Sequence, residues 1–447
     1  MAQRITLAAG ILTLVGLAGC GERATLPVAD GTGADPKLPA PNETVLPTVN
    51  IARPEPWTEG EMPLAAAGYS VSEFAEGLDH PRWLYLLPNG DVLVAETNKP
   101  ANASGGGVMG WIEEQVMARA GAGVPSADRI TLLRDGDGDG RVDSRHVFLT
   151  RDDGLASPFG MALVGDALYV ANFRSVLRYP YQAGATAIEE APVTVARLPA
   201  KGEKAGHWTR NLLASADGRK LYVAVGSVSN VGDNGMAVEE GRAAIHAIDL
   251  ATGRMRLFAS GLRNPVGMAF EPATGDLWTV VNERDMLGSD LVPDYMTRVS
   301  DGGHYGWPWV YFGTHRDARA PGAPPRAGFD RPDYALGPHT ASLGLAFAPD
   351  GSGVYIGQHG SWNRKPYAGY KVVFVRFERG KPVGKPVDLL TGFLEGDVAR
   401  GRPVGVAFDR ADALLVADDV GGKVWRVTGP GLGSGLDTAA KGATAAP

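Results

Sequence analysis

Five short stretches of this chain place histidine, arginine or acidic side chains beside apolar runs, where packing alone does not require them. They are Gly206–Asn211 (GHWTRN), Gly261–Pro265 (GLRNP), Asn282–Asp285 (NERD) followed by Asp290 and Asp294, Gly337–Thr340 (GPHT) with Gln358–Arg364 (QHGSWNR), and Arg400–Pro403 (RGRP). Arginine forks pair bidentately with carboxylates, so the arginines favour a ligand that carries several carboxylates. A histidine suits general-base chemistry near neutral pH, and an acidic turn suits a hard cation such as calcium.

A sixth stretch, DGDGDGRVD, places Asp135, Asp137, Asp139 and Asp143 at positions 1, 3, 5 and 9 of a loop. This is the front half of a calcium loop, but position 12 is a histidine and not the bidentate glutamate of an EF-hand. The alternative is an Asp/Gly-rich hairpin turn. The residues leave both interpretations open, and any calcium here would be structural rather than catalytic.

The chain also contains a repeat that must position these residues. Six copies of a short apolar run, a turn and a second apolar run begin at His80, Ser157, His207, Asn264, Ser342 and Arg402. The phrase PVGMAF at residue 265 returns as PVGVAF at residue 403. Further strand candidates lie between the copies, at residues 129–133, 244–249, 371–377 and 424–427.

The spacing between successive copies leaves room for about four strands in each repeat, which is typical of a propeller blade. The sequence therefore predicts an all-β fold, a six-bladed β-propeller with long rim loops. The repeated phrase would be the inner strand and hairpin of each blade, and the five stretches would converge at one end of the channel. Residues 310–342 are expected to form a lid or rim loop, and a short helix is expected around residues 111–118.

The N-terminus predicts export and lipid attachment. An apolar run from Ile5 to Ala18 ends in LAGC at Cys20, the only cysteine of the chain, and the run is too short for a membrane span. The motif resembles the bacterial lipobox, which implies lipidation of Cys20 and a location on the periplasmic side of a membrane. The alternative is a plain secretory signal. We therefore expect a signal peptide at 1–20, a flexible tether at 21–64, the propeller at 65–429 and a disordered tail at 430–447.

Composition excludes several classes of function. The formal net charge is −7 and there is no basic cluster, so nucleic acid is not an expected partner. One cysteine allows neither an internal disulfide nor a multi-cysteine zinc site. The chain contains no G-x-G-x-x-G nicotinamide fingerprint, no HExxH helix and no C-x-x-C-H haem site.

The motifs GHWTRN, SGLRNPVGMAF, NERD, GGHYGWP, GQHGSWNR and GRPVGVAF, in this order, resemble the soluble quinoprotein sugar dehydrogenases, which use pyrroloquinoline quinone (PQQ). The resemblance covers about residues 68–427 and is greatest to the L-sorbosone dehydrogenase branch. It implies a six-bladed propeller that holds PQQ over calcium in the mouth of the channel. It also implies that a sugar or sugar aldehyde transfers hydride to the quinone, from which electrons pass to a quinone or cytochrome acceptor.

The resemblance also assigns roles to individual residues. His207 matches the general base, and Arg263 with Asn264 matches the pair beside the quinone oxygens. Arg400 and Arg402 match two arginines that hold the PQQ carboxylates. The remaining positions match calcium ligands: Glu283, Arg284 and Asp285 in one turn, the last two through their carbonyls, and Asp294 and Tyr305 in a further calcium region.

Some positions depart from the family pattern. Gly206 stands where the glucose enzymes carry an aspartate before the base. Gly337 and His339 replace a tryptophan and a threonine near the cofactor. The cofactor-binding lysine has no counterpart, which leaves His359 or Arg364 as its substitute. These changes bear on the substrate more than on the cofactor.

The sequence thus predicts a PQQ- and calcium-dependent oxidation of a sugar or sugar aldehyde by a protein held to the membrane by its lipid anchor alone. Two alternatives stay open. One is a metal-dependent lactonase or other hydrolase on a six-bladed propeller, and the other is a non-catalytic propeller that binds a carbohydrate or a protein. The identity of the sugar, the natural electron acceptor and the oligomeric state are not determined by the sequence.

Overall fold

The computed structural model describes residues 22–42, 48–100, 124–200 and 205–432. The described chain is built almost entirely of strands, with three short 3-10 turns at Val28–Gly31, Arg151–Asp153 and Met236–Glu239. None of its described helices is long and apolar enough to cross a bilayer. Cys20 and the helix expected around residues 111–118 lie outside the described residues.

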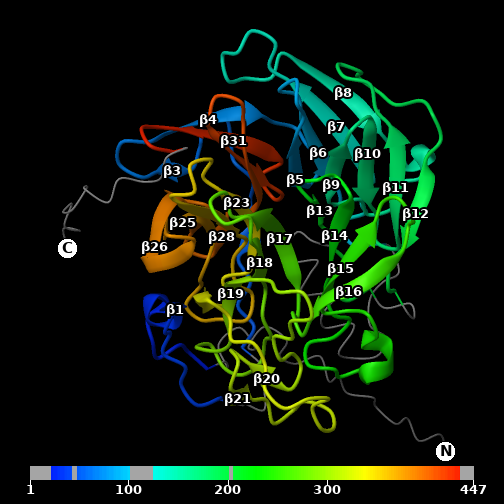
Figure 1. The fold of residues 1–447 in the computed structure, drawn as a ribbon. Coiled ribbons are helices and arrows are strands. Elements are labelled where there is room, and N and C mark those ends of the chain that lie inside the picture. The colour runs from blue at the N-terminus through cyan, green and yellow to red at the C-terminus, as the bar shows by residue number, and fades with distance from the viewer. Residues whose placement is uncertain (1–21, 43–47, 101–123, 201–204, 433–447) are drawn as a thin grey trace, which may run out of the picture.

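Six sheets of four or five strands make up the body, and Figure 1 shows them arranged around a common centre. Each is a meander of antiparallel neighbours, and each begins with one of the six predicted hairpins. From the centre outward, the strands of the first three sheets are β5 (Pro81–Leu86), β6 (Val92–Glu96), β7 (Arg129–Arg134) and β8 (Ser144–Leu149); β9 (Met161–Val164), β10 (Ala167–Ala171), β11 (Ser175–Pro180) and β12 (Val193–Arg197); and β13 (Leu212–Ala214), β14 (Lys220–Val225), β15 (Ala244–Asp249) and β16 (Met255–Ser260).

The other three sheets each recruit a strand from the N-terminal part of the chain. Their strands are β17 (Pro265–Phe270), β18 (Leu277–Val281), β19 (Pro293–Arg298), β22 (Tyr334–Pro338) and β1 (Thr32–Gly33); β23 (Ser342–Phe347), β24 (Gly353–Gln358), β25 (Lys371–Glu378), β26 (Lys381–Thr391) and β3 (Leu64–Ala65); and β29 (Pro403–Phe408), β30 (Leu414–Asp418), β31 (Lys423–Thr428) and β4 (Ser70–Ala75). Two small sheets add β2 (Arg53–Pro54) with β27 (Leu394–Glu395) and β28 (Val398–Ala399), and β20 (Val310–Tyr311) with β21 (His315–Arg316). Because β4 pairs with β31, the two ends of the described body share one sheet.

Glycines explain why the inner strands repeat the same phrase. A side chain on Gly267 of β17 would place its Cβ 2.7 Å from the carbonyl oxygen of Leu343 in β23, and one on Gly405 of β29 would come within 2.8 Å of the Arg82 carbonyl in β5. Gly344 of β23 faces the Val404 carbonyl of β29 in the same way. The inner strands therefore approach each other at backbone contact, which leaves no room for a β-carbon.

Side chains join two of the three remaining pairs of inner strands, and the third pair, β9 with β13, is joined by the Gly160 amide, which donates to the Arg210 carbonyl (2.9 Å). The amide of Leu163 in β9 donates to the Tyr85 hydroxyl of β5 (2.8 Å), and the Asn211 side chain before β13 donates to the Val266 carbonyl of β17 (2.8 Å). Trp83 of β5 also packs on Phe159, with ring centroids 4.9 Å apart. The apolar core lies between the faces of neighbouring sheets, because second strands such as β6 are buried along their whole length.

Two expectations from the sequence differ from the structure. The predicted lid at 310–342 ends in β22, which is the fourth strand of the β17 sheet, so only its first part is a rim loop. The predicted tether is not separate from the body: β1, β2 and β3 pair with body strands, and the Trp57 indole donates to Asp418 (2.7 Å). Composition suggested a tether because these pairings join residues far apart in sequence and leave no local periodicity.

Candidate functional site

One edge of the body collects most of the predicted site residues. In each sheet the inner strand starts opposite the end of the second strand, as shown by the pairs Pro265 with Val281, Ser342 with Gln358, and Pro403 with Asp418. Side chains that precede inner strands therefore lie beside side chains that follow second strands. We call this the site edge.

His207 precedes β13 at the site edge, and its ring has a defined tautomer. The Nδ1 atom lies 3.0 Å from both the carbonyl oxygen and the Oγ atom of Ser227. The Ser227 hydroxyl donates its own hydrogen to the Ser229 carbonyl (2.7 Å), so Nδ1 must be the donor in its contacts with Ser227. The Nε2 atom, which no described residue engages, is then free to accept a proton.

The surroundings of His207 keep its ring neutral. Burial and, next, the charge of Arg263 lower the pKa of His207 well below its usual range. Behind the ring, a Cβ on Gly226 would lie 2.6 Å from the His207 Cβ and would also overlap the amide oxygen of Asn264. Only glycine fits between the histidine and Asn264, whose amide oxygen is buried without a partner among the described residues.

Arg263 holds the predicted acidic turn. Its Nη1 donates to the Asn282 side-chain oxygen (3.2 Å) and to the Glu283 carbonyl, and its Nη2 lies 3.2 Å from Asp285 Oδ2. Asn230 completes this arrangement, since its side-chain oxygen accepts from Arg263 Nη2 (3.0 Å) and from the Asp285 amide (2.9 Å). Asn230 could not be predicted as a site residue from the repeats, because it lies outside the repeated phrases.

His339 lies on the other side of Asp285. Its Nδ1 is 3.2 Å from Asp285 Oδ1 and its Nε2 is 2.9 Å from the Gly288 carbonyl. Burial opposes a charge on the ring, but the hydrogen bond and the charge of Asp285 outweigh it and raise the pKa of His339. Both nitrogens are therefore occupied by protein acceptors. We expected His339 to present a free nitrogen to the cofactor, but its ring instead positions Asp285.

Two of the predicted calcium ligands of the acidic turn, Asp285 and Glu283, are already hydrogen-bonded within the protein. The Asp285 carbonyl accepts from Asn230 Nδ2 (2.9 Å) and Arg284 Nη1 (3.1 Å), and the buried Arg284 side chain forms an ion pair with Asp317 at 2.8 Å. Burial raises the pKa of Glu283 to about 7, and its carboxylate accepts from the Arg284 amide (2.9 Å). As it stands, the turn does not offer calcium a set of free oxygens.

The second predicted calcium region is not assembled either. Asp294 accepts from the Glu283 amide (2.9 Å), the Thr340 hydroxyl (3.0 Å) and the Ser342 amide (2.7 Å), and burial raises its pKa to about 6. The Tyr305 hydroxyl instead donates to the Arg298 carbonyl at the opposite end of β19. Arg298 is four positions after Asp294 along the strand, roughly 13 Å at 3.3 Å per residue, so Asp294 and the Tyr305 hydroxyl do not share a site.

A second network lies at the same edge. Asp419, which follows β30, binds Arg82 Nη1 (2.7 Å) and His359 Nε2 (2.9 Å) through one carboxylate oxygen. Burial would raise the pKa of Asp419, but the neighbouring His359 and Arg82 lower it overall, so the carboxylate is ionised. Arg82 and Asp419 were not predicted, although both stand inside the repeat copies that begin at His80 and Arg402.

Arg402 carries the clearest unmet hydrogen-bonding capacity at this edge. Its side chain packs over the Tyr370 ring at 4.8 Å, the residue is only 3% exposed, and its Nε and Nη2 atoms have no partner among the described residues. A buried guanidinium with unpaired N–H groups is costly unless an anion meets it. This pattern fits the carboxylate of a bound ligand.

The two other predicted arginines are directed elsewhere. Arg364 donates to the carbonyls of Pro366 (2.7 Å) and Leu26 (3.2 Å), so it secures the N-terminal segment. Arg400 lies 3.9 Å from Glu55 and 3.6 Å from Glu395, both exposed glutamates. Neither guanidinium lies with Arg402, because a long side chain takes its partners from whichever segment packs beside it.

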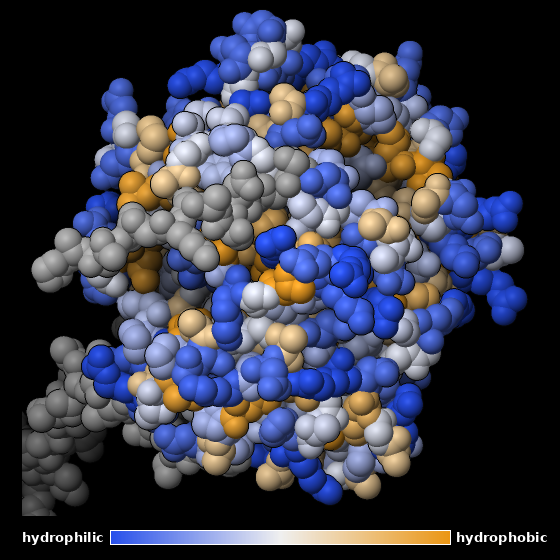
Figure 2. Space-filling view, turned by 60° about the vertical axis from the view of Figure 1, so that its left-hand side comes forward, coloured by the Kyte–Doolittle hydropathy of each residue, from blue (hydrophilic) through white to orange (hydrophobic). Residues whose placement is uncertain are grey.

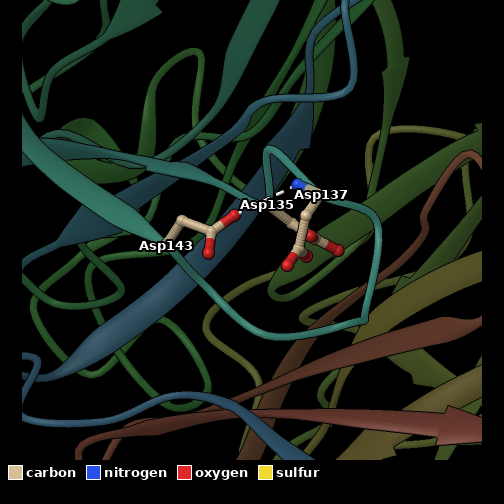
Figure 3. A group of neighbouring side chains, drawn as sticks. All are labelled: Asp135, Asp137 and Asp143. Carbon is tan, nitrogen blue, oxygen red and sulfur yellow. Dashed lines mark hydrogen bonds between the residues drawn. The ribbon is translucent and has the colours of Figure 1, made fainter.

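The aspartate loop at 135–143 joins β7 to β8, away from the site edge. Figure 3 shows Asp135, Asp137 and Asp143 turned toward one another, and their oxygens lie within 4.8 Å. Asp139 is not part of this group. Asp135 accepts from the amides of Gly138 (2.8 Å) and Gly140 (2.9 Å), as in the predicted Asp/Gly-rich turn. The loop geometry is explained by these bonds alone.

The site edge can therefore do two things chemically. It offers a neutral imidazole with a free nitrogen, His207, which can take a proton from a hydroxyl. It also offers a buried cation, Arg402, which fits a carboxylate of a polar ligand, and an unpartnered amide oxygen on Asn264, which can accept from an N–H or O–H group.

Comparison with known proteins places these observations in context. Residues 123–297 and 320–430 match the model of the TrAA12-like family. The chain is 30% identical over 248 residues to an uncharacterized protein of Borreliella burgdorferi, covering 52% of this chain and 63% of that one. It is 23% identical over 417 residues to the pyrroloquinoline quinone-dependent sugar dehydrogenase of Hypocrea jecorina, covering 81% of this chain and 88% of that one.

Solved structures share the fold. A Trichoderma reesei structure of carbohydrate-active enzymes family AA12 matches with a TM-score of 0.67 and 21% identity, over 85% of this chain and 99% of that one. The holo form of the PQQ domain of a pyranose dehydrogenase from Coprinopsis cinerea matches with a TM-score of 0.64 and 21% identity, over 85% of this chain and all of that one, 100%. The β-propeller predicted from the repeats is thus the fold of this chain.

Proposed function

The chain belongs to the TrAA12-like family, and on that basis we propose that it is a PQQ-dependent dehydrogenase that oxidises a sugar or a sugar aldehyde. The relatives that carry a functional name support this reading, since they are named PQQ-dependent sugar or pyranose dehydrogenases. We further propose that the six large sheets are six blades of one ring. The contacts between successive inner strands support that arrangement.

The observation that carries the proposal is the state of His207. Its Nδ1 is committed to Ser227, its Nε2 meets no described residue, and its pKa is lowered by burial and by Arg263. A neutral imidazole with one free nitrogen is what a general base requires. A propeller that only bound a ligand would have no need of it.

In the proposed reaction, His207 Nε2 accepts the proton of a substrate hydroxyl while the carbon that bears it loses a hydride. The carbon–oxygen bond becomes a carbonyl, and the Ser227 carbonyl stabilises the imidazolium through Nδ1. An aldehyde would react as its hydrate, whose hydroxyl supplies the proton, and would leave as a carboxylic acid. When bound, PQQ supplies the acceptor for the hydride.

The residues that would hold PQQ are those with unmet hydrogen bonds. Arg402 would meet a carboxylate with its Nε and Nη2 groups, and Asn264 would contribute its side-chain amide. Arg263 would add positive potential near the site, although its own N–H groups are engaged with the 282–285 turn. Arg400 and Arg364 are not included, because their partners lie elsewhere.

We propose a calcium requirement on the sequence resemblance alone. The Asp285 carbonyl and the carboxylates of Glu283 and Asp294 accept hydrogen bonds within the protein, and no catalytic step is assigned to calcium. The proposed substrate class is an aldose or sorbosone, and the proposed acceptor is a quinone or cytochrome. Attachment through lipidated Cys20 on the periplasmic side of a bacterial membrane completes the proposal, and it rests on the LAGC motif.

Reconstitution tests the proposed activity. The chain without its first 20 residues is stripped with a chelator, and calcium and PQQ are then added together and separately. Dye reduction with a panel of aldoses and sorbosone is expected only when PQQ and calcium are added together, and it should be lost in His207→Ala. PQQ binding is followed by absorbance and calorimetry. A folded protein that binds no PQQ with calcium present would rule the proposal out, and hydrolysis of a lactone without PQQ would favour the hydrolase alternative.

A further inference from the structure

The first described residues of the chain are bound to the body at the site edge. Glu22 accepts the amide of Ser289 on its carboxylate (2.7 Å), and its carbonyl accepts from the hydroxyls of Ser289 (3.2 Å) and Thr48 (3.1 Å). The Ala24 amide donates to the Lys365 carbonyl at 2.7 Å. Residues 22–24 are therefore not free to move away from the propeller.

Asp290 strengthens this attachment. Its buried carboxylate accepts both the amide and the hydroxyl of Thr25, each at 2.7 Å, and also the amide of Leu26. From the other side, Arg364 donates to the Leu26 carbonyl (3.2 Å). Hydrogen bonds to a charged group are stronger than those between neutral groups. Several of them acting together hold residues 22–26 in place.

The attachment point belongs to the site. Ser289 and Asp290 continue the loop that begins at the acidic turn and carries Asp285 and Gly288, the two partners of His339. The N-terminal segment thus binds the loop that organises the site edge. The hydrogen bonds of residues 22–26 go to the site edge and not to the opposite edge, where the hairpin turns between first and second strands lie.

The reach of the chain sets the distance from this point to Cys20. Glu22 is two residues after Cys20, so their Cα atoms are at most about 7 Å apart. A free tether of the expected 44 residues would instead have a root-mean-square length of roughly 35–40 Å. The length of the link between Cys20 and the body therefore determines whether a lipid-anchored protein has a fixed orientation on the membrane.

We propose that the lipid on Cys20 holds the site edge against the bilayer surface, so that the mouth of the propeller faces the membrane. This inference rests on the lipidation proposed above. Its consequence is that an electron acceptor dissolved in the bilayer meets the site edge directly, while sugars must enter from the side. On the face drawn in Figure 2 the described apolar side chains form small groups among polar ones, so that face offers no broad hydrophobic surface for the bilayer.

Distances from labelled residues to the bilayer test the orientation. Cys20 is the only cysteine and its thiol would be occupied by lipid, so an introduced cysteine takes a fluorophore at one position. Ala237→Cys lies on the loop between β14 and β15 at the site edge, and Ala411→Cys lies on the turn between β29 and β30 at the opposite edge; both positions are exposed. Full-length lipidated protein is placed in phosphatidylethanolamine/phosphatidylglycerol vesicles that contain a headgroup-labelled acceptor lipid.

Energy transfer is expected to be several-fold more efficient from position 237 than from position 411. A twelve-residue Gly/Ser insertion after Gly21 should remove that difference, because it restores a free tether. Equal transfer from the two positions without the insertion, or a difference that survives the insertion, contradicts the proposal. So does a protein that stays off the vesicles with a reactive Cys20 thiol. The orientation is read without substrate or PQQ, so its failure is separate from failure of the proposed activity, which dye reduction reports in the same samples.

Discussion

The Nδ1 atom of His339 lies 3.2 Å from Oδ1 of Asp285, while Oδ2 of the same carboxylate lies 3.2 Å from Nη2 of Arg263. One buried carboxylate therefore joins two cations that lie far apart in sequence, Arg263 before β17 and His339 between β22 and β23. Burial raises the pKa of Asp285, but the hydrogen bond from His339 and the charge of Arg263 lower it overall. This arrangement fixes Arg263, whose charge in turn helps to keep His207 neutral.

The first prediction concerns His207. In His207→Asn the amide can still donate to the Ser227 carbonyl, but no group remains to accept the substrate proton. We expect kcat to fall by about 10²–10⁴, the usual contribution of a general base, while PQQ affinity measured by absorbance stays unchanged. His315→Asn, on the distant β21, is the control and should keep full activity. A variant at position 207 that retains the wild-type kcat would remove His207 from the mechanism.

The pH dependence follows from the lowered pKa of His207, which burial and then Arg263 cause. The base works when neutral, so kcat/KM should not fall on the acid side until the pH is well below 6.5, the usual histidine value. The sign for stability agrees: the unfolded chain takes up this proton first, so the contribution to stability is present above pH 6.5 and is lost as pH falls. Initial rates from pH 4.5 to 8 with saturating PQQ measure the pH dependence of kcat/KM. An acid limb centred at or above pH 6.5 would contradict a lowered pKa of His207.

Substitutions of Arg402 and of Arg400 give a matched test of cofactor binding. Arg402→Met removes two buried N–H groups that have no protein partner, so PQQ affinity should fall by about 3 kcal/mol, or about a hundredfold. The free energy of unfolding without PQQ should change by no more than about 1 kcal/mol, because loss of the contact with Tyr370 is offset by removal of an unpaired charge.

Arg400→Met should leave the affinity unchanged, since its ion pairs with exposed glutamates are worth about 0–1 kcal/mol. Calorimetric titration with PQQ and urea unfolding measure both variants. Equal effects of the two substitutions on PQQ affinity would show that the unpaired atoms of Arg402 have no role in binding.

Trp57 tests whether the N-terminal segment is bound to the body. Trp57→Phe keeps an aromatic ring against Phe393 and Trp425 but removes the N–H that donates to Asp418. We expect the free energy of unfolding to fall by about 1.5–3 kcal/mol, the value of a hydrogen bond to a charged group. Glu59→Gln, an exposed change in the same segment, should have no effect. Identical urea midpoints for Trp57→Phe and the wild type would restore the tether interpretation.

Gly344 tests the close approach of the inner strands. A methyl group at this position would overlap the Val404 carbonyl oxygen, and a backbone neighbour cannot move aside without disturbing its own sheet. Gly344→Ala should therefore cost at least about 3 kcal/mol, at the upper end for overpacking. Gly384→Ala has open space and only the strain of a positive φ of 71°, and should cost about 1–2 kcal/mol. Thermal unfolding compares them, and similar losses would show that the strands are less closely packed.

Much of the architecture follows from local sequence. Each repeat copy is a hairpin because apolar alternation and a turn of Asp, Gly, Asn or Pro specify two short antiparallel strands without reference to the rest of the chain. The same periodicity puts His207, Arg263, His339 and Arg402 before inner strands, so their common edge could be predicted. The glycine of the repeated phrase could be seen in the sequence. The contact that requires it could not, because the carbonyl that it faces belongs to the inner strand of the next sheet.

The partners of the charged residues depended on the tertiary structure. Arg263, Arg364, Arg400 and Arg402 look alike in sequence, yet one binds a turn, one secures residues 22–26, one meets exposed glutamates and one is buried against Tyr370 with two nitrogens unpartnered. The reason is physical: a long flexible side chain is held by whatever packs beside it, and here that is a segment tens or hundreds of residues away. The same holds for the described part of residues 22–64, whose composition reads as a tether but which is joined to distant strands and loops by β1, β2 and β3 and by the bonds of Thr25 and Trp57.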